Sequence, residues 1–207
     1  MEKVEIDTPF GLANAHLERA DEPRAALVLG HGAGGGVQAR DLVAVARVAH
    51  SLRFDVVLVE QPYRVAGRRA PAPAHQLDTA WTVVIEHLTA AELRGLPLVV
   101  GGRSSGARVA CRTAGATGAV GVLCLAFPLV PPSRAGGTSA PSRLPELDLV
   151  TVPTLVVQGI RDRFGMPPPS ERRSVVHVES DHSLRTDLGS VEDAVRAWLP
   201  KVVGERG

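Results

Sequence analysis

The stretch LVVGGRSSGAR, residues 98–108, holds the main clue to the architecture of this chain of 207 residues. Its first residues are apolar and predict a buried β-strand, while the residues after Gly106 predict a helix. Between the two lies the pattern G-x-S-x-G, formed by Gly102, Ser104 and Gly106. This pattern is typical of a sharp turn that lifts a serine above a sheet. Ser105 does not fit, because the residues two positions away from it are not glycines, so Ser104 is the candidate nucleophile.

Short runs of Val, Leu and Ile alternate with longer amphipathic stretches on both sides of this turn. Such alternation is typical of helices that cross between parallel strands. Residues 3–7 and 13–20 alternate in polarity and predict half-exposed, antiparallel strands. Buried strands are predicted for the apolar runs 25–30, 54–60, 96–102, 121–127, 153–159 and 174–180. The sequence therefore predicts an α/β fold with a mostly parallel sheet.

Apolar residues recur at helical spacing over residues 42–49, 77–91 and 191–198, which predicts helices that pack against this sheet. Ser190 is the expected N-cap of the last helix. Pro and Gly gather in three loops, each placed after a strand, at residues 61–74, 131–145 and 164–169. Open parallel sheets bind their ligands at this end of the strands. None of the loops is long enough to form a second domain, so we expect one domain over residues 1–207.

Composition limits the partners of the chain. The net charge is +1 and no long run of one sign occurs, so we expect neither nucleic acid nor an anionic membrane as a partner. The longest apolar run, residues 119–130, is broken by Gly121 and Pro128 and is shorter than the roughly 18 residues of a membrane helix. The first twelve residues lack the charged and apolar regions of a secretory signal, which predicts a cytoplasmic protein.

Cysteines and histidines give no metal-binding pattern. Cys111 and Cys124 do not form a C-x-x-C pair, and we expect buried free thiols. The histidines outside the candidate site are scattered and show no spacing typical of metal ligands. His31, by contrast, lies in the glycine-rich segment 30–36 and is expected to shape that loop. We therefore predict a site without a metal or cofactor.

A serine hydroxyl becomes a strong nucleophile only when a base takes its proton and hydrogen-bond donors receive the charge that develops on the attacked carbonyl oxygen. The backbone N–H of Ser105 is one predicted donor to this oxyanion. The second is expected in the glycine-rich segment 30–36, which follows an earlier strand. Ala33 is the predicted donor there, with Gly34 close behind it.

The base and its partner acid are expected later in the chain, in the order Ser, Asp, His. His182 follows the last predicted strand, and Asp162 follows the strand before it. The carboxylate of Asp162 would hold the imidazole in the tautomer that accepts the serine proton. Asp181 is a weaker candidate because adjacent residues usually point apart, and Asp148 lies before its strand instead of after it.

These residues resemble the α/β-hydrolase superfamily, in particular its small members related to dienelactone hydrolases and to the testis-expressed hydrolase-like proteins. The resemblance extends over most of the chain and rests on the segments GHGAGGG (30–36), QPYRVAGRRAPAP (61–73), GGRSSGARVA (101–110), AFPLVPP (126–132), VPTLVVQGIRDRFG (152–165) and SDHSL (180–184). It implies an eight-stranded, mostly parallel sheet with helices on both faces and a triad of Ser104, Asp162 and His182. Similar elbows often carry a bulky residue and a second glycine where this chain has Ser105 and Ala107, so packing around the turn is expected to differ.

Two alternatives stay open at this point. Gly30, Gly32 and Gly35 match the G-x-G-x-x-G pattern of a dinucleotide-binding domain, and Glu60 ends the next strand. That interpretation leaves the three triad residues without a purpose. The second alternative is a catalytically silent protein with the hydrolase fold, because some members of the wider group are scaffolds and a fold does not fix an activity.

The sequence thus predicts a serine hydrolase that acts on an ester, thioester or lactone through an acyl-enzyme. The segment between the strands at 121–127 and 153–159 is too short for a large lid, so the pocket is expected to be open. The partner is a small-molecule substrate, and the protein is a monomer or a homodimer. Candidate substrate-binding residues are Gly34, Tyr63, Arg103, Phe127 and Phe164. The arginines near the rim have two interpretations, binding of an anionic substrate or simple exposure to water. They are Arg64, Arg68, Arg69, Arg103, Arg134 and Arg143.

Overall fold

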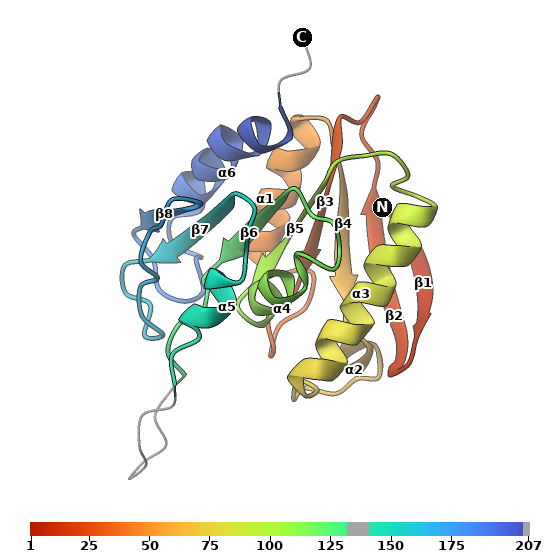
Figure 1. The fold of residues 1–207 in the computed structure, drawn as a ribbon, viewed down its shortest axis with the longest axis horizontal. Coiled ribbons are helices and arrows are strands. Elements are labelled where there is room, and N and C mark those ends of the chain that lie inside the picture. Colours follow the sequence, from red (N-terminus) through yellow and green to blue (C-terminus); the bar gives the residue numbers. More distant parts are fainter. Residues whose placement is uncertain (132–140, 205–207) are drawn as a thin grey trace.

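The computed structural model describes residues 1–131 and 141–204, and within them it contains the eight expected strands (Figure 1). The strands are β1 (Glu2–Thr8), β2 (Gly11–Glu18), β3 (Ala25–Gly30), β4 (Phe54–Glu60), β5 (Leu98–Arg103), β6 (Gly121–Leu125), β7 (Thr154–Gly159) and β8 (Arg173–Val178). The helices are α1 (Arg40–Ser51), α2 (Pro62–Val65), α3 (Ala74–Ala90), α4 (Ser105–Thr113), α5 (Leu144–Asp148) and α6 (Leu188–Val203). The predicted α/β class is confirmed.

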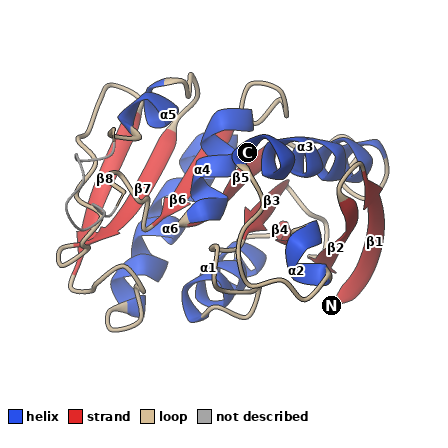
Figure 2. Cartoon of the chain, turned by 90° about the horizontal axis from the view of Figure 1, so that it is seen from below, coloured by secondary structure: helices blue, strands red, loops and turns tan. Residues whose placement is uncertain are grey.

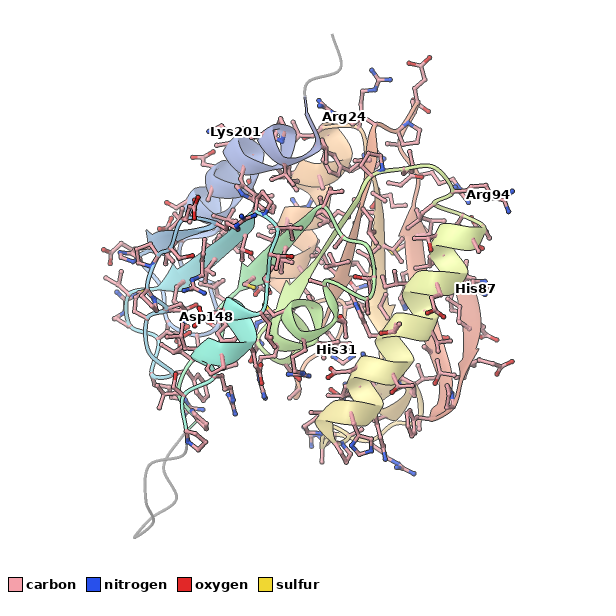
Figure 3. The ribbon with its side chains drawn as sticks, in the orientation of Figure 1. Arg24, His31, His87, Arg94, Asp148 and Lys201 are labelled. Carbon is pink, nitrogen blue, oxygen red and sulfur yellow. The ribbon has the colours of Figure 1, made fainter. Side chains whose placement is uncertain are left out.

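All eight strands form one sheet in the order β1-β2-β4-β3-β5-β6-β7-β8. β2 pairs antiparallel with both β1 and β4, and all remaining neighbours are parallel. The expected division into an antiparallel start and a parallel remainder is therefore correct. Because β3 to β8 run in the same direction, their carboxyl ends meet at one end of the sheet, which we call the carboxyl end. Figure 3 shows His31 there and Arg24 at the opposite, amino end.

Helices cover both faces of the sheet, as Figure 2 shows. α1 and α6 pack on one face, and α3 and α4 pack on the other. β3 illustrates how the sequence supports two cores: Leu27 and Leu29 join the core of α1, whereas Ala26 and Val28 join the core that contains Trp81 of α3. Alternate residues of a strand point to opposite faces, so a strand covered on both sides must be apolar throughout.

The start of α6 differs from the expectation. The helix begins at Leu188, and Asp187 is its N-cap, with Oδ1 accepting a hydrogen bond from the Ser190 N–H at 3.4 Å. Ser190 therefore lies inside the first turn, and its prediction as the cap was wrong. The other carboxylate oxygen of Asp187 accepts from the Glu179 N–H at 3.0 Å, next to the end of β8. One aspartate thus joins the helix start to the strand end, which a serine hydroxyl is too short to do.

The predicted loops contain short helices. α2 lies within residues 61–74, and α5 begins at the end of the segment 131–145. Arg134 and the rest of residues 132–140 lie outside the described residues. In the described part of the chain, no helix combines the length and the apolar character needed to cross a membrane.

The two cysteines are free and buried, as expected. Cys111 on α4 and Cys124 on β6 lie with their Sγ atoms 3.5 Å apart. The hydrogen bond to Cys124 and burial both raise the pKa of the Cys111 thiol well above its ordinary value. The pair packs between the helix and the strand as a small apolar contact.

Candidate active site

Ser104 lies on a strained turn between β5 and α4. Its backbone has φ 51° and ψ −107°, a conformation that residues other than glycine rarely adopt. Gly102 and Gly106 permit the turn because a Cβ at either position would overlap the carbonyl oxygen of Gly30. The Ser104 N–H donates to the Leu125 carbonyl at 2.9 Å and so fixes the turn to β6. The turn thus presents the Ser104 side chain at the carboxyl end of the sheet.

Three side chains that are distant in the sequence form one hydrogen-bonded series at this end. The Ser104 Oγ lies 3.0 Å from the His182 Nε2, and the His182 Nδ1 lies 2.8 Å from the Asp162 Oδ2. A carboxylate only accepts hydrogen bonds, so the His182 Nδ1–H is donated to Asp162, and Nε2 lies within hydrogen-bonding distance of the serine hydroxyl. The Asp162 carboxylate is fully buried, whereas His182 is 20% exposed. The geometry therefore orients the imidazole toward the hydroxyl.

Further hydrogen bonds hold Asp162 in place. Its Oδ1 accepts from the Phe164 N–H at 2.9 Å, and its Oδ2 accepts from the Gln158 Nε2 at 2.8 Å. Gln158 is fully buried and also reaches the carbonyls of Phe127 and Gly165. We did not predict this residue from the sequence. The available signal was a long polar side chain directly after the apolar residues 155–157 of β7.

The rival carboxylates are engaged elsewhere. Asp181 is exposed and accepts two hydrogen bonds from Ser183. Asp148 forms an ion pair with Arg173, the first residue of β8. Of these two and Asp162, only Asp162 contacts the imidazole of His182.

The glycine-rich segment after β3 forms a tight turn. The Gly35 N–H donates to the Gly32 carbonyl at 3.1 Å, which leaves Ala33 and Gly34 as the central residues of the turn. The hydroxyl of Tyr63 donates to the Ala33 carbonyl at 2.9 Å. Burial raises the pKa of Tyr63 to about 12, so this donor keeps its proton at neutral pH.

His31 connects this turn to the end of β4. Its Nε2 accepts from the Gln61 N–H at 3.1 Å, so its proton resides on Nδ1 and is donated to the Gly32 carbonyl at 2.8 Å. Burial lowers the pKa of His31, which keeps the ring neutral and this pair of hydrogen bonds intact. The structure thus gives His31 the loop-shaping position expected from the sequence.

Ser105 is the first residue of α4. The first N–H groups of a helix have no partner within the helix, so the Ser105 N–H is available beside Ser104. One small cavity is lined by Ser105, and a second cavity adjoins the first. The smaller is lined by Ser105, His31 and Trp81, and the larger, of about 80 Å³, by Phe10, Arg68 and Ala72. Gln61, Tyr63 and Leu77 line both cavities and therefore separate them.

The predicted substrate-binding residues fall into different environments. Phe164 lies beside the site, with its ring 4.4 Å from the His182 ring in an edge-on arrangement. Phe127 is fully buried in the core. Contrary to the expectation, its side chain is therefore not available to a substrate. Arg103 is only 18% exposed and forms an ion pair with Asp41, so it is directed inward instead of toward a substrate. Gly34 and Tyr63 remain beside the turn.

The rim arginines also differ among themselves. Arg64 donates to the carbonyl of Arg68, and Arg143 donates to the carbonyl of Pro128 at 2.9 Å. Arg68 lines the larger cavity. Among the described residues, no cluster of three or more His, Cys, Asp or Glu side chains is arranged to hold a metal ion.

Comparison with known proteins supports the assignment of this fold. The model of a family described as "Alpha/beta hydrolase domain" matches residues 23–193. No curated protein matches the sequence.

Solved structures with the same fold share little sequence with this chain. Est1E from Butyrivibrio proteoclasticus superimposes with a TM-score of 0.78 at 15% identity, covering 99% of this chain and 100% of its own. An alpha-beta serine hydrolase homologue from Coxiella burnetii gives 0.77 at 15% identity, covering 96% and 97%. A dienelactone hydrolase from Anabaena variabilis gives 0.75 at 15% identity, covering 97% and 96%.

The family match decides against the dinucleotide-binding alternative, whose glycines form the strand end and turn beside Ser104. Glu60, which ends β4 and belonged to that alternative, is instead paired with Asn14 and His16 of β2. The matched family, the strand order and the turn at Ser104 agree, and the chain belongs to the α/β-hydrolase family.

Proposed function

We propose that this protein is a serine hydrolase that cleaves an ester-like bond in a small molecule through an acyl-enzyme on Ser104. The observation that carries the proposal is the unbroken series of hydrogen bonds from Ser104 through His182 to Asp162. A hydroxyl, an imidazole and a buried carboxylate in this order are the groups that acyl transfer requires.

In the first half of the reaction, the Ser104 Oγ forms a bond to the carbonyl carbon of the substrate while its proton moves to the His182 Nε2. The electron pair of the C=O bond moves onto the oxygen, where the N–H groups of Ala33 and Ser105 would stabilise the charge. When this pair returns, the bond to the leaving group breaks, and the leaving group takes the proton from Nε2. Asp162 stabilises the imidazolium that exists between these steps.

Water completes the cycle by the same route. His182 takes a proton from a water molecule, whose oxygen attacks the acyl carbon, and the proton then returns to the Ser104 Oγ as the ester bond breaks. The product is a carboxylic acid, and no step draws on a cofactor. Pre-aligned N–H donors of this kind contribute roughly 2.7–4 kcal/mol each to such transition states.

The surroundings of Ser104 favour a compact substrate. The cavity lined by Ser105, the neighbour of Ser104, is small, and Tyr63, which lines this cavity, holds the turn with the proposed oxyanion donor Ala33. A dienelactone hydrolase shares this fold, so lactones are reasonable first substrates to test together with short esters and thioesters. We propose that the partner of the site is such a small molecule.

A fluorophosphonate probe, together with hydrolysis of p-nitrophenyl acetate, tests the proposal. The wild type should be labelled and active, and Ser104→Ala should be neither. Ser105→Ala is the matched control, because it removes the adjacent hydroxyl but keeps the backbone N–H; it should retain labelling. Absence of labelling in the wild type would instead indicate a silent binding protein with this fold, and labelling of Ser104→Ala would show that another residue is the nucleophile.

A further inference from the structure

The proposed reaction requires three separate loops to keep their mutual positions: the turn at Ser104, the loop of His182 and the turn that contains Ala33. We propose that Arg103 is a positioning residue that holds these loops in register through its guanidinium group. The role of Arg103 in catalysis rests on the proposed function, whereas its contacts do not depend on it.

Each nitrogen of the guanidinium faces a different segment. Nη2 donates to the backbone carbonyl of His182 at 3.1 Å. Nε lies 3.0 Å from the Asp41 Oδ2 at the start of α1. Nη1 packs closely against Gly32: a Cβ at Gly32 would lie 2.8 Å from this nitrogen. Arg103 itself is the last residue of β5, directly before Ser104, so one side chain joins four segments.

Asp41 explains why the guanidinium stays in this position. Its side chain is only 1% exposed, and burial raises its pKa while the Arg103 charge opposes that rise. Its other oxygen accepts from the Leu42 N–H at 3.0 Å. A buried carboxylate without a cation is costly, so Asp41 and Arg103 hold each other.

The hydrogen bond from Arg103 to His182 links this ion pair to the proposed catalytic base. The acceptor is the main-chain carbonyl of the proposed base itself, so a shift of the guanidinium moves the imidazole relative to the Ser104 Oγ. A planar fork with several N–H groups can serve Asp41 and His182 at once. A lysine ammonium is a single point and cannot reach both, so charge alone should not replace Arg103.

Two variants and a matched control test the proposal. Arg103→Met should lower kcat for p-nitrophenyl acetate by on the order of 10²-fold with little change in KM, because the nucleophile and base lose their alignment. Arg103→Lys should recover only a small part of this loss. Arg172→Met is the control: Arg172 also donates to a backbone carbonyl, that of Thr151 at 2.8 Å, but lies before β8 at the amino end of the sheet. It should keep the wild-type kcat.

Two readouts separate positioning from a general loss of structure. Added ethylguanidinium should partly restore kcat in Arg103→Ala, which a merely unstable variant would not show. The downfield proton resonance of the His182 Nδ1–H, which reports the contact with Asp162, should be present in the wild type and shifted or lost in Arg103→Met.

The resonance also distinguishes the two proposals. An inactive wild type whose resonance is lost in Arg103→Met would retain the positioning role and refute the proposed function. An active wild type whose kcat and resonance are both unchanged in Arg103→Met would overturn the positioning role alone. Full activity of Arg103→Lys would overturn the argument from the fork.

Discussion

The hydrogen bonds around the candidate site and an exposed ion pair at the amino end of the parallel strands differ in burial. At the carboxyl end, His31, Gln61 and Gln158 are 5% exposed or less, and the side chain of each forms a hydrogen bond with the backbone of a segment distant in the sequence. At the amino end, Arg53 pairs with Glu22 although their side chains are 57% and 88% exposed. Buried polar side chains also occur at the amino end, where Asp55 and Arg173 are 2% and 5% exposed, but the buried hydrogen bonds at the carboxyl end surround Ser104, Asp162 and His182.

This difference teaches where substitutions should matter. A buried polar group that loses its partner costs roughly 1–3 kcal/mol, whereas an exposed ion pair contributes at most about 1 kcal/mol. The buried polar groups at the carboxyl end therefore hold its loops in fixed positions at a cost in stability. Substitutions at the carboxyl end should change activity or the pH dependence of stability, and substitutions in the exposed pair of Arg53 and Glu22 should change little.

The largest expected effect is that of Asp162→Asn. An amide can donate to the imidazole and stabilise the wrong tautomer, so kcat for p-nitrophenyl acetate should fall by roughly 10⁴-fold. Steady-state kinetics checks this, and circular dichroism should show an unchanged fold. Asp181→Asn is the control in the exposed neighbour of His182 and should leave kcat unaltered. Comparable losses in both variants would mean that the acid has been assigned to the wrong residue.

Gln158→Met should have the next largest effect. The substitution keeps the length of the side chain but removes the N–H donor to Asp162, and a hydrogen bond to a charged group is worth about 1.5–3 kcal/mol. We expect a loss in kcat of at least about tenfold at an almost constant KM. Gln38→Met, at an exposed position after β3, is the matched change. Equal kinetics of the two variants would contradict a role of Gln158 in holding the carboxylate.

Ser104→Gly should separate activity from stability. Glycine adopts the observed backbone angles freely, so the free energy of unfolding should rise by about 1 kcal/mol while hydrolysis is lost. Urea unfolding measures this change. Ser105→Gly, on the adjacent helical residue, should instead lower stability by about 0.5–1 kcal/mol. A decrease for Ser104→Gly would show that the turn stores no strain.

The smallest expected effect concerns His31 and pH. Burial lowers its pKa in the folded protein below the ordinary value of about 6.5, so the unfolded chain binds more protons as the pH falls. Stability should therefore decrease below about pH 6.5. In His31→Gln, which does not titrate, thermal unfolding should depend less on pH between 5 and 7. Identical slopes for the two proteins would contradict a buried, neutral His31.

The sequence was sufficient for the buried strands because their apolar runs are continuous. A run such as residues 25–30 has no other stable place than a sheet covered on both faces. The turn at Ser104 and the two loops of Asp162 and His182 were also predictable, since each follows such a run. Local spacing and chain order carry this information.

Contacts between distant residues were not predictable in the same way. Arg103 was expected to face a substrate because it lies in a loop-like motif, and only the fold brings Asp41 and the His182 carbonyl to its guanidinium. Phe127 looked available because its strand was expected to end there, but its side chain is fully buried in the core. Gln158 was overlooked because a polar residue in an apolar run gives no sign of the acceptor it serves.

The buried pair Cys111 and Cys124 has a practical consequence. They are the two cysteines of the chain, and both are shielded from solvent. The raised pKa of the Cys111 thiol also opposes formation of the reactive thiolate. A cysteine introduced at an exposed position should thus be the preferred target of a maleimide dye or spin label in the native protein. Probes could report loop motions during turnover without first removing the natural thiols.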